Sequence, residues 1–578
     1  MKKNLNIYLV AFFIVAIILS LTNTSCTPPF NSRSVNLDSD SLTAHFDYFR
    51  YKGDDDFYKN NLLPGDNYYY NPILPGWYSD PSICTDGENY FMVTSTFSFF
   101  PGVPIFHSTD LMNWKQIGHV LDRPEQLPLE GQRTSRGIFA PAISYNPHNK
   151  TWYMITTNMQ GGNFFVKTQD PFSSWSDPIW LPDVHGIDPS FLFDEDGKAY
   201  IVNNDEPDGG STYEGHRAIR IVEFDVEKDK TVGPSTMLVN GGVNLDEKPI
   251  WIEGPHLYNI KGDYYLMCAE GGTSVDHREV IFRGKSPMGP FIPADVNPIL
   301  TQRHLPRNRE LPVTCAGHAD LIQDKDGKWW SVFLACRPIE NNFENLGRET
   351  FLMPVGWSDS GFPYITKGDE LIPRIVQMKG VKRDESAFPF GNFEKTDEFD
   401  SLKLGMDWLT LRGDASELYS LQTNPGYLSL KSADVASNEV KELAYVCRRL
   451  QHHKFECETR LYFEPKSEDE MAGLLLYKDE THQYLMGIKH LATDSIEINL
   501  IKVKEEGAEV LASQTLAKTN GPIDLKINST GKELSFYYAT DNSWSTLATN
   551  INAYYLSTAQ SYGFTGTEVG LYASQKEY

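Results

Sequence analysis

The stretch "GIDPSFLFDEDGKAYIVNN", residues 186–204, has the pattern of a β-hairpin. A short apolar run, an Asp-Gly turn and a second apolar run are what two paired antiparallel strands require. Related hairpins occur four more times along the chain. They are "SDPSICTDGENYFMV" from Ser79, "APAISYNPHNKTWYMI" from Ala140, "EGPHLYNIKGDYYLMC" from Glu253 and "GHADLIQDKDGKWWSV" from Gly317.

The spacing of these hairpins predicts the fold of the first half of the chain. When Asp80, Ala140, Asp188, Gly254 and His318 are aligned, successive copies lie 60, 48, 66 and 64 residues apart. A unit of about four strands repeated around a centre is typical of a β-propeller. Helical periodicity is almost absent, which argues against α-solenoids and βαβ folds. We therefore expect an all-β chain with a five-bladed β-propeller over residues 71–380.

The polar residue at the mouth of each hairpin differs from copy to copy. In a propeller the first strand of each blade lines the central channel, so Asp80, Asp188, Glu253 and His318 are predicted to converge on one funnel. A single Asp-Pro at a strand entry is usually turn chemistry, and one buried carboxylate can simply tie two blades together. Three acids held close raise at least one pKa, which separates an acid from a base. Glycosidic bond cleavage requires such a pair of carboxyl groups.

The second half of the chain has a different pattern. Residues 381–395 are charged and punctuated by Phe and Pro, and are interpreted as a linker. Beyond them, runs such as "KFECETRLYF", "AGLLLYKDE" and "SIEINLIKV" alternate with period two. This pattern predicts an antiparallel β-sandwich over residues 396–578.

The N-terminus has the features of a bacterial export signal. Two lysines precede an apolar run, and "LTNTSC" resembles a loose lipobox that ends at Cys26. Residues 1–25 are predicted to be a lipoprotein signal peptide, Cys26 to be lipidated, and residues 26–70 to be a polar tether. The alternatives are an uncleaved anchor or a plain signal peptide. The protein is therefore expected to be exported and to contact the membrane only through the lipid on Cys26.

Composition limits the class of partner. The formal net charge of −25 repels phosphate backbones, which argues against nucleic acid. Six further cysteines show no CxxC spacing, and buried free thiols are expected for them.

Five motifs occur in an order that resembles glycoside hydrolase family 43, especially its β-xylosidases and α-L-arabinofuranosidases. They are "NPILPGWYSDPSI", "GIDPSF", "WIEGPHLY", "AGHADL" and "LGRETF". The resemblance implies a five-bladed propeller and an inverting single displacement. By motif, Asp80 corresponds to the general base, Glu253 to the general acid, and Asp188 to the carboxylate that orients the acid and raises its pKa.

Other positions carry over from the same resemblance. His318 matches a histidine on the propeller axis that lies near a bound water or a calcium ion in relatives. The alternative role of His318 is to bridge two blades. No cofactor other than such a calcium ion is expected. Arg348 matches an arginine that hydrogen-bonds sugar hydroxyls, with a salt bridge between blades as the alternative. Phe97 matches an aromatic residue in the wall of the sugar pocket of relatives, with packing in the core as the alternative. Phe139 stands before Ala140 in the substrate pocket, where relatives usually have tryptophan.

The sandwich has its own resemblance and its own open question. "FDSLKLGMDWLTLR", "NPGYLSLK" and "YGFTGTEVGLYA" are similar to the concanavalin A-like module that follows the propeller in many such xylosidases. That module either lends a loop to the mouth of the active site or binds glycans independently. In the propeller, "GGSTYEGHR" (residues 209–217) is interpreted as a long loop at the rim of the funnel, with no assigned role.

Together these features predict an exo-acting, inverting glycoside hydrolase that releases xylose or arabinose from xylan-type oligosaccharides of the plant cell wall. One alternative is another arabinose-polymer-cleaving glycosidase of this fold. A second is a fructan-cleaving enzyme, whose surrounding motifs are missing here. The non-enzymatic alternative is a surface lectin in which the carboxylates only bind hydroxyls.

Overall fold

The computed structural model describes residues 42–518, 521–541, 543–576 and 578, and β-strands make up most of their regular structure. The helices are short: α1 (Asp56–Asn60), α2 (Thr558–Ser561) and the 3-10 turns Pro124–Gln126, Leu245–Glu247 and Ala553–Leu556. None of the described helices is long and apolar enough to cross a membrane. The predicted signal peptide, Cys26 and residues 27–41 of the tether lie outside the described residues.

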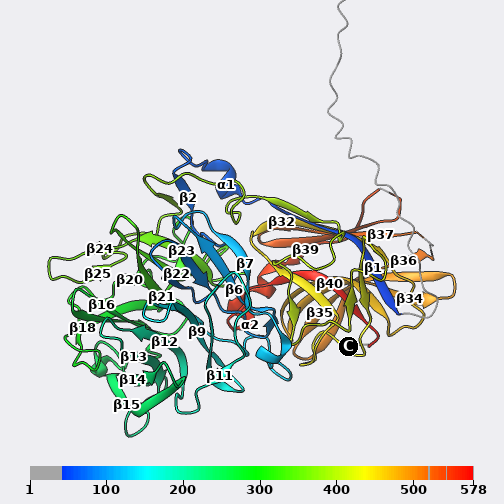
Figure 1. Cartoon of the computed structure of the whole chain (residues 1–578). Coiled ribbons are helices and arrows are strands. Elements are labelled where there is room, and N and C mark those ends of the chain that lie inside the picture. The colour runs from blue at the N-terminus through cyan, green and yellow to red at the C-terminus, as the bar shows by residue number, and fades with distance from the viewer. Residues whose placement is uncertain (1–41, 519–520, 542, 577) are drawn as a thin grey trace, which may run out of the picture. The chain divides into compact units, whose positions relative to one another are not determined.

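Five antiparallel sheets follow one another along the first half of the chain (Figure 1). The first contains β3 (Ser82–Thr85), β4 (Tyr90–Val93), β6 (Gly102–Ser108) and β7 (Lys115–Leu121). The second contains β8 (Ala142–Asn146), β9 (Thr151–Asn158), β10 (Gly162–Thr168) and β11 (Ile179–Trp180). The third contains β12 (Ile187–Phe193), β13 (Ala199–Asp205), β14 (Ala218–Asp225) and β15 (Lys230–Asn240). The fourth contains β16 (Glu253–Ile260), β17 (Asp263–Glu270), β18 (Arg278–Gly284), β19 (Ile292–Pro293) and β20 (Leu300–Thr301), and the fifth β21 (Thr314–Gln323), β22 (Trp329–Cys336) and β23 (Glu349–Pro354).

The first strands of these sheets contact one another in a ring. β3 packs on β8, β8 on β12, β12 on β16, β16 on β21, and β21 returns to β3. Beyond the fifth sheet, β24 (Gly356–Trp357) pairs with β25 (Pro363–Tyr364), and β26 (Ile375–Gln377) pairs with β2 (Tyr68–Tyr70). The latter pairing brings the end of this region back to its beginning. The expected propeller architecture is confirmed.

Aromatic side chains fill the space between neighbouring sheets. The ring of Phe191 on β12 lies 5.6 Å from that of Phe165 on β10 and 5.0 Å from that of Phe224 on β14. All three are buried, and burial of such side chains contributes about 1.5–3 kcal/mol each. The six cysteines among the described residues are free thiols, five of them buried, as the sequence predicts.

The second half of the chain, joined by one strand from near the N-terminus, forms two further sheets with an apolar core between them. One contains β29 (Tyr419–Ser420), β30 (Leu428–Lys431), β1 (Thr43–Gly53), β32 (Lys454–Tyr462), β37 (Ile523–Thr530), β38 (Glu533–Ala539) and β39 (Ser545–Asn552), with β27 (Glu394–Asp397) paired to β1. The other contains β31 (Tyr445–Arg449), β40 (Glu568–Ser574), β33 (Met471–Asp479), β34 (His482–Ala492), β35 (Ser495–Lys504) and β36 (Gly507–Ala517). The predicted antiparallel sandwich is confirmed.

The predicted tether over residues 26–70 is wrong for the part that the structure describes. Residues 43–53 form β1, which lies between β30 and β32 in the sandwich. Its apolar positions Ala44, Phe46, Phe49 and Tyr51 are fully buried in the sandwich core. A register shift between Phe46 and Phe49 breaks the simple alternation of the strand. The intervening charged residues made the segment resemble a solvated connector.

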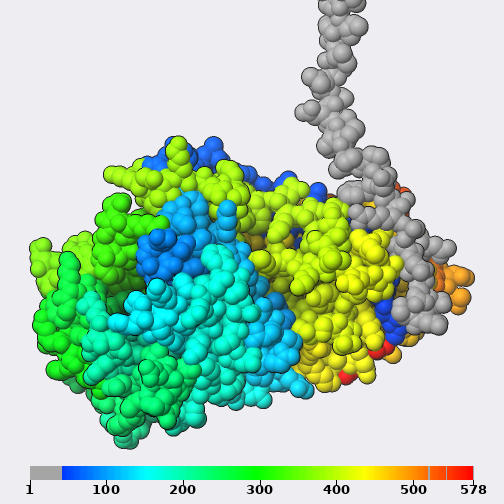
Figure 2. Space-filling view, in the orientation of Figure 1, coloured from blue at the N-terminus to red at the C-terminus, as the bar shows by residue number. Residues whose placement is uncertain are grey.

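The propeller and the sandwich share backbone pairing. In the first sheet's region, β5 (Phe99–Phe100) pairs with β28 (Thr410–Leu411), which belongs to the second half of the chain. The predicted linker also packs, because the ring of Phe388 lies 5.5 Å from that of Tyr78 and 5.4 Å from that of Phe106. Figure 2 shows the cyan and blue atoms of the propeller in contact with the yellow atoms of the sandwich.

Candidate active site

The inner strands of the propeller begin with an unusual backbone conformation. Asp80, Asp188 and His318 have φ values of 52°, 54° and 50°, and Gly254, which follows Glu253, has a φ of 56°. In three of these strands the ladder also shifts register at this point. Left-handed backbone costs about 1–3 kcal/mol per residue and is tolerated best by Gly, Asn, Asp and His. The repeated polar residue is therefore the residue type that this bend permits.

These bends direct the three predicted carboxyl groups to one place. Asp80, Asp188 and Glu253 line a single cavity of about 840 Å³, within the size range of small-ligand pockets. They are only 4%, 7% and 7% exposed. His318 and Arg348 line the same cavity. The structure thus brings together all the polar residues that the sequence selected.

Asp80 is held as a carboxylate. Its Oδ1 accepts a hydrogen bond from Nη1 of Arg348 at 3.0 Å, and its Oδ2 accepts one from Oγ of Ser95 at 2.5 Å. Burial favours the neutral acid, but Arg348 and then His318 outweigh it and hold the pKa of Asp80 below its usual value. Arg348 therefore ties the fifth sheet to the first while it stands in the cavity, and its buried Nε has no partner among the described residues.

Glu253 and Asp188 have the opposite tendency. Burial, and then the negative charge of Asp188, raise the pKa of Glu253 well above its ordinary value. Burial, and then Asp80, raise the pKa of Asp188 to about 7. Oδ2 of Asp188 accepts a hydrogen bond from the backbone N–H of Gly254 at 3.1 Å, which fixes the strand next to Glu253. The cavity therefore holds one ionised carboxylate beside a pair of groups that retains protons.

His318 lies between the sheets that carry the acids. Its Nδ1 is 3.8 Å from Oδ1 of Asp80, and burial lowers its pKa to about 4, so the ring is neutral at pH 7. A Cβ at position 254 would meet the His318 ring at 2.9 Å, so the close packing of these blades requires Gly254.

The donor set near His318 does not match calcium. Calcium takes six to eight oxygen ligands. Among the described residues no cluster of three or more His, Cys, Asp or Glu side chains is placed to hold a metal ion. The chemistry of the cavity is therefore assigned to protein side chains alone.

Three phenylalanines and Arg348 form the wall of the cavity on the Asp80 side. The ring of Phe97 lies 5.9 Å from that of Phe139 and is stacked at 5.9 Å on that of Phe564, while Phe139 and Phe564 are 5.6 Å apart. The guanidinium of Arg348 lies 5.8 Å from the Phe97 ring and 5.2 Å from the Phe564 ring. Ala140, next to Phe139, also lines the cavity.

Phe564 comes from the sandwich, and the motifs of the sequence do not single it out as a residue of the site. Its backbone N–H donates to Oγ of Ser135, a residue of the propeller, at 2.9 Å. Tyr562 and Gly563 just before it have φ values of 60° and 83°, which turns the chain towards the cavity. The signal was present in "YGFTG", an aromatic residue between two glycines that does not follow the period-two pattern.

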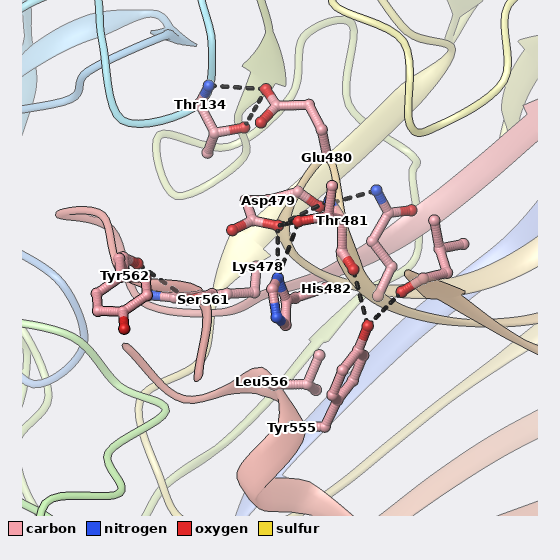
Figure 3. A network of polar contacts seen from close by, with 12 residues as sticks. Thr134, Lys478, Asp479, Glu480, Thr481, His482, Tyr555, Leu556, Ser561 and Tyr562 are labelled. Carbon is pink, nitrogen blue, oxygen red and sulfur yellow. Dashed lines mark hydrogen bonds and ion pairs between the residues drawn. The ribbon is translucent and has the colours of Figure 1, made fainter. Parts of the chain in front are cut away.

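Two buried charged residues, Lys478 and Glu480, make contacts at and beside the base of this loop, and Figure 3 shows the bonds between Glu480 and Thr134. Nζ of Lys478 donates to Oγ1 of Thr558 at 2.9 Å and also to the carbonyl of Thr565, so it joins both ends of the loop. The next but one residue, Glu480, accepts hydrogen bonds from the backbone N–H and the hydroxyl of Thr134 in the propeller, at 2.8 and 2.9 Å. Lys478 therefore holds the loop to the sandwich, the Ser135 contact holds it to the propeller, and the neighbouring turn at Glu480 adds a second link between the domains.

Comparison with known families and proteins agrees with this geometry. The model of "Glycosyl hydrolases family 43" matches residues 69–363, and that of the "Beta xylosidase C-terminal Concanavalin A-like domain" matches residues 396–578. The chain is 38% identical over 511 residues to a "Xylosidase/arabinosidase" of Butyrivibrio fibrisolvens, covering 87% of this chain and 95% of the relative. It is 35% identical to the "Non-reducing end alpha-L-arabinofuranosidase BoGH43B" of Bacteroides ovatus, covering 87% and 91%.

Solved structures agree as well. A GH43_12 protein retrieved from a capybara gut metagenome superposes with a TM-score of 0.87 at 41% identity, covering 92% of this chain and 99% of that one. The xylan beta-1,4-xylosidase from Bacillus halodurans C-125 gives a TM-score of 0.79 at 31% identity, covering 88% and 96%. With the motifs, the propeller, the sandwich and both family models in agreement, the chain belongs to glycoside hydrolase family 43.

Proposed function

We propose that this enzyme removes single xylose or arabinose units from the ends of xylan-type oligosaccharides, with inversion at the anomeric carbon. The observation that carries the proposal is that three carboxyl groups line one cavity in unlike surroundings: Asp80 accepts a hydrogen bond from Arg348 at 3.0 Å, whereas Glu253 is buried beside Asp188. Asp80 is kept charged by Arg348, whereas Glu253 is kept protonated by burial and by Asp188. A base and an acid in one cavity are what inverting hydrolysis requires.

The two groups have complementary steps in this mechanism. Asp80 accepts a proton from water as the water oxygen bonds to the anomeric carbon. Glu253 gives its proton to the glycosidic oxygen, and the bond from that oxygen to the anomeric carbon breaks. Asp188 acts on Glu253 through charge and through the Gly254 N–H rather than by contact with the sugar. Each proton transfer is typically worth about 10²–10⁴ in rate.

The phenylalanine wall supports attack at a chain end. Phe97 and Phe564 are contributed by different domains and close the cavity beside Asp80. A terminal sugar fits against this wall, whereas a longer chain would have to pass through it. Flat aromatic faces suit the C–H faces of a sugar, and the forked donors of Arg348 suit neighbouring hydroxyls.

The names of the relatives support pentose substrates. Two of them are a xylosidase/arabinosidase and a non-reducing-end α-L-arabinofuranosidase, and a similar solved structure is a xylan β-1,4-xylosidase. Phe139, in the position where the family motif usually has tryptophan, is part of the wall that would contact the pentose.

The test is hydrolysis of aryl β-D-xylopyranoside, aryl α-L-arabinofuranoside and arabinoxylan oligomers, with the released sugar identified. We expect one pentose to be released from chain ends, and proton NMR to detect the inverted anomer first. Release of internal fragments would contradict exo action, and a retained anomer would contradict the roles of Asp80 and Glu253. Binding of oligomers without hydrolysis would favour the lectin alternative.

We also propose that the enzyme is exported and anchored through a lipid on Cys26. The support is the sequence of residues 1–26, which lie outside the described residues. Labelled palmitate incorporated by the wild type but not by Cys26→Ala is the expected result. Equal labelling of the two proteins would contradict the anchor.

A further inference from the structure

Trp251 presents its indole on the wall of the active-site cavity. It precedes Glu253 by two residues, lines the same cavity, and is 41% exposed. Its backbone has a φ of 51°, a conformation that bulky residues rarely adopt. A large apolar side chain held in strained backbone at the edge of a cavity is a candidate for ligand contact.

The conformation of Trp251 is fixed from both sides. Its backbone N–H donates to the carbonyl of Gly215 at 2.8 Å, and the Gly271 N–H donates to the carbonyl of Ile250 at 2.9 Å. A Cβ at Gly215 would lie 3.4 Å from the indole nitrogen, and one at Gly272 would lie 3.8 Å from the indole Cδ1. The indole is therefore seated between two loops, and one of them is the rim segment 209–217.

The rim segment is itself a built structure. The ring of Tyr213 stacks on that of His216 at 4.4 Å, and the Tyr213 hydroxyl donates to the carbonyl of Pro249 at 2.8 Å. Nε2 of His216 lies 2.8 Å from Oδ1 of Asn240. These contacts fix the position of Arg217, the last residue of the segment.

Arg217 is directed to the same part of the cavity. Its Nε donates to Oδ1 of Asn204 at 3.1 Å, its Nη1 pairs with Glu206, and its guanidinium lies 5.8 Å from the Trp251 ring. Asn204 in turn donates to the carbonyl of Ile252 at 2.6 Å, next to Glu253. Nη2 of Arg217 makes no hydrogen bond to another described residue, so it is available to a ligand.

Trp251 and Arg217 lie on the acid side of the site. Trp251 precedes Glu253 by two residues, and Arg217 is linked to the neighbouring Ile252 through Asn204. Asp80 instead contacts Arg348, whose guanidinium lies over the rings of Phe97 and Phe564. A general acid stands beside the oxygen that departs, so the departing sugar lies on the Glu253 side. The two residues are therefore placed to contact the leaving group rather than the sugar that is released.

We propose that Trp251 and Arg217 form the subsite for the leaving group, and that this leaving group is a pyranose ring such as a xylose unit of the chain. The indole stacks on the C–H face of the ring and Nη2 of Arg217 donates to one of its hydroxyls. This assignment rests on the proposed function and deepens it, because it names the sugar on the far side of the broken bond.

The test compares substrates with and without a leaving sugar. The pairs are β-1,4-xylobiose with β-D-xylopyranosyl fluoride, and an α-L-arabinofuranosyl xylo-oligosaccharide with α-L-arabinofuranosyl fluoride. Fluoride leaves as a single atom and cannot occupy the proposed subsite. We expect Trp251→Ala to lower kcat/KM on the preferred oligosaccharide about tenfold or more. The fold-loss on the matching fluoride should be at least about ten times smaller. Trp251→Phe, which keeps a flat ring, should retain more of the oligosaccharide activity.

Trp544→Ala is the matched control, because Trp544 is 39% exposed and does not line the cavity. It should leave both activities within about twofold of wild type, as surface substitutions usually do. Equal losses on oligosaccharide and fluoride for Trp251→Ala, or no loss on either, would overturn the assignment. If Trp251→Ala fails to fold, Trp251→Leu provides the same comparison. A wild-type enzyme inactive on all four substrates would refute the proposed function instead.

Discussion

Nη1 of Arg348 lies 3.0 Å from Oδ1 of Asp80, so the same guanidinium that faces the sugar pocket also fixes the charge of the proposed base. Arg348 stands just before a strand of the last sheet of the propeller and Asp80 just before the first strand of the first sheet, and closure of the ring of sheets brings them together. Closing the ring therefore also establishes the ionisation state that the proposed chemistry needs.

The proposed base should be required for every substrate. Replacing Asp80 with Asn removes the proton acceptor and keeps the size of the side chain. We expect kcat to fall about 10²–10⁴-fold on both xylobiose and 2,4-dinitrophenyl β-D-xyloside, because water must be activated in both reactions. Steady-state kinetics check this. A loss on xylobiose alone would be incompatible with a role as base.

The proposed acid should be required only for poor leaving groups. Glu253→Gln cannot donate a proton, yet dinitrophenolate departs without one. We expect a loss of about 10²–10⁴-fold on xylobiose and a much smaller one on the dinitrophenyl xyloside. Equal losses on the two substrates would show that Glu253 acts in some other way.

Asp188 should set the alkaline limit of activity. Glu253 must be protonated to act, and burial together with the charge of Asp188 raises its pKa. In Asp188→Asn the second carboxyl group is gone, so Glu253 loses its proton at lower pH. The alkaline limb of the kcat/KM profile should move to lower pH, while the acid limb, set by Asp80, stays below the ordinary Asp value of about 3.9. An alkaline limb that stays in place or moves upward would contradict this role.

Phe564 should contribute to catalysis from the second domain. In Phe564→Ala the wall loses its contacts with Phe97 and Phe139, and Arg348 loses one of its aromatic neighbours. We expect kcat/KM on both aryl pentosides and glycosyl fluorides to fall about tenfold, because the wall contacts the sugar being released. Phe172→Ala is the control, since Phe172 is 57% exposed and outside the cavity. Unchanged kinetics in Phe564→Ala would show that the sandwich contributes nothing to the active site through this residue.

The buried ion pair between Arg412 and Glu480 should fasten the two domains. Both are buried, and Glu480 also accepts hydrogen bonds from Thr134 in the propeller. Breaking such a pair costs about 3–5 kcal/mol because a charge is left unpaired. We expect Glu480→Gln to lower the free energy of unfolding in urea by about that amount. Glu509→Gln, which removes a partner of Lys504 at the surface, should change it little. Similar midpoints for both variants would contradict the prediction.

The propeller and its acids could be predicted because their signals are local. Each hairpin has its own turn and period-two pattern, and Asp80, Asp188 and His318 occupy the same place in their repeats. Phe564 could not be found in this way. It reaches Ser135, 429 residues earlier in the chain, only through a loop whose direction depends on Tyr562 and Gly563. Its position is a property of packing between domains, which no local pattern encodes.

The strand β1 was missed for a related reason. Its buried residues are interspersed with Asp47, Arg50 and Lys52 without a regular alternation, and nothing nearby in the sequence supplies its partners. Those partners, β30 and β32, lie hundreds of residues away. Composition therefore suggested a solvated segment, whereas long-range pairing made it a central strand.

The position of β1 also makes the sandwich a discontinuous domain. Residues 43–53 belong to it by pairing, so the propeller is an insertion between the first strand of the sandwich and the rest. A single cut near residue 395 cannot separate the two domains cleanly. The sandwich fragment would lose β1, and the propeller fragment would keep that strand without its partners. Exchange of the sandwich between relatives, in evolution or in engineering, must therefore transplant two pieces of sequence together.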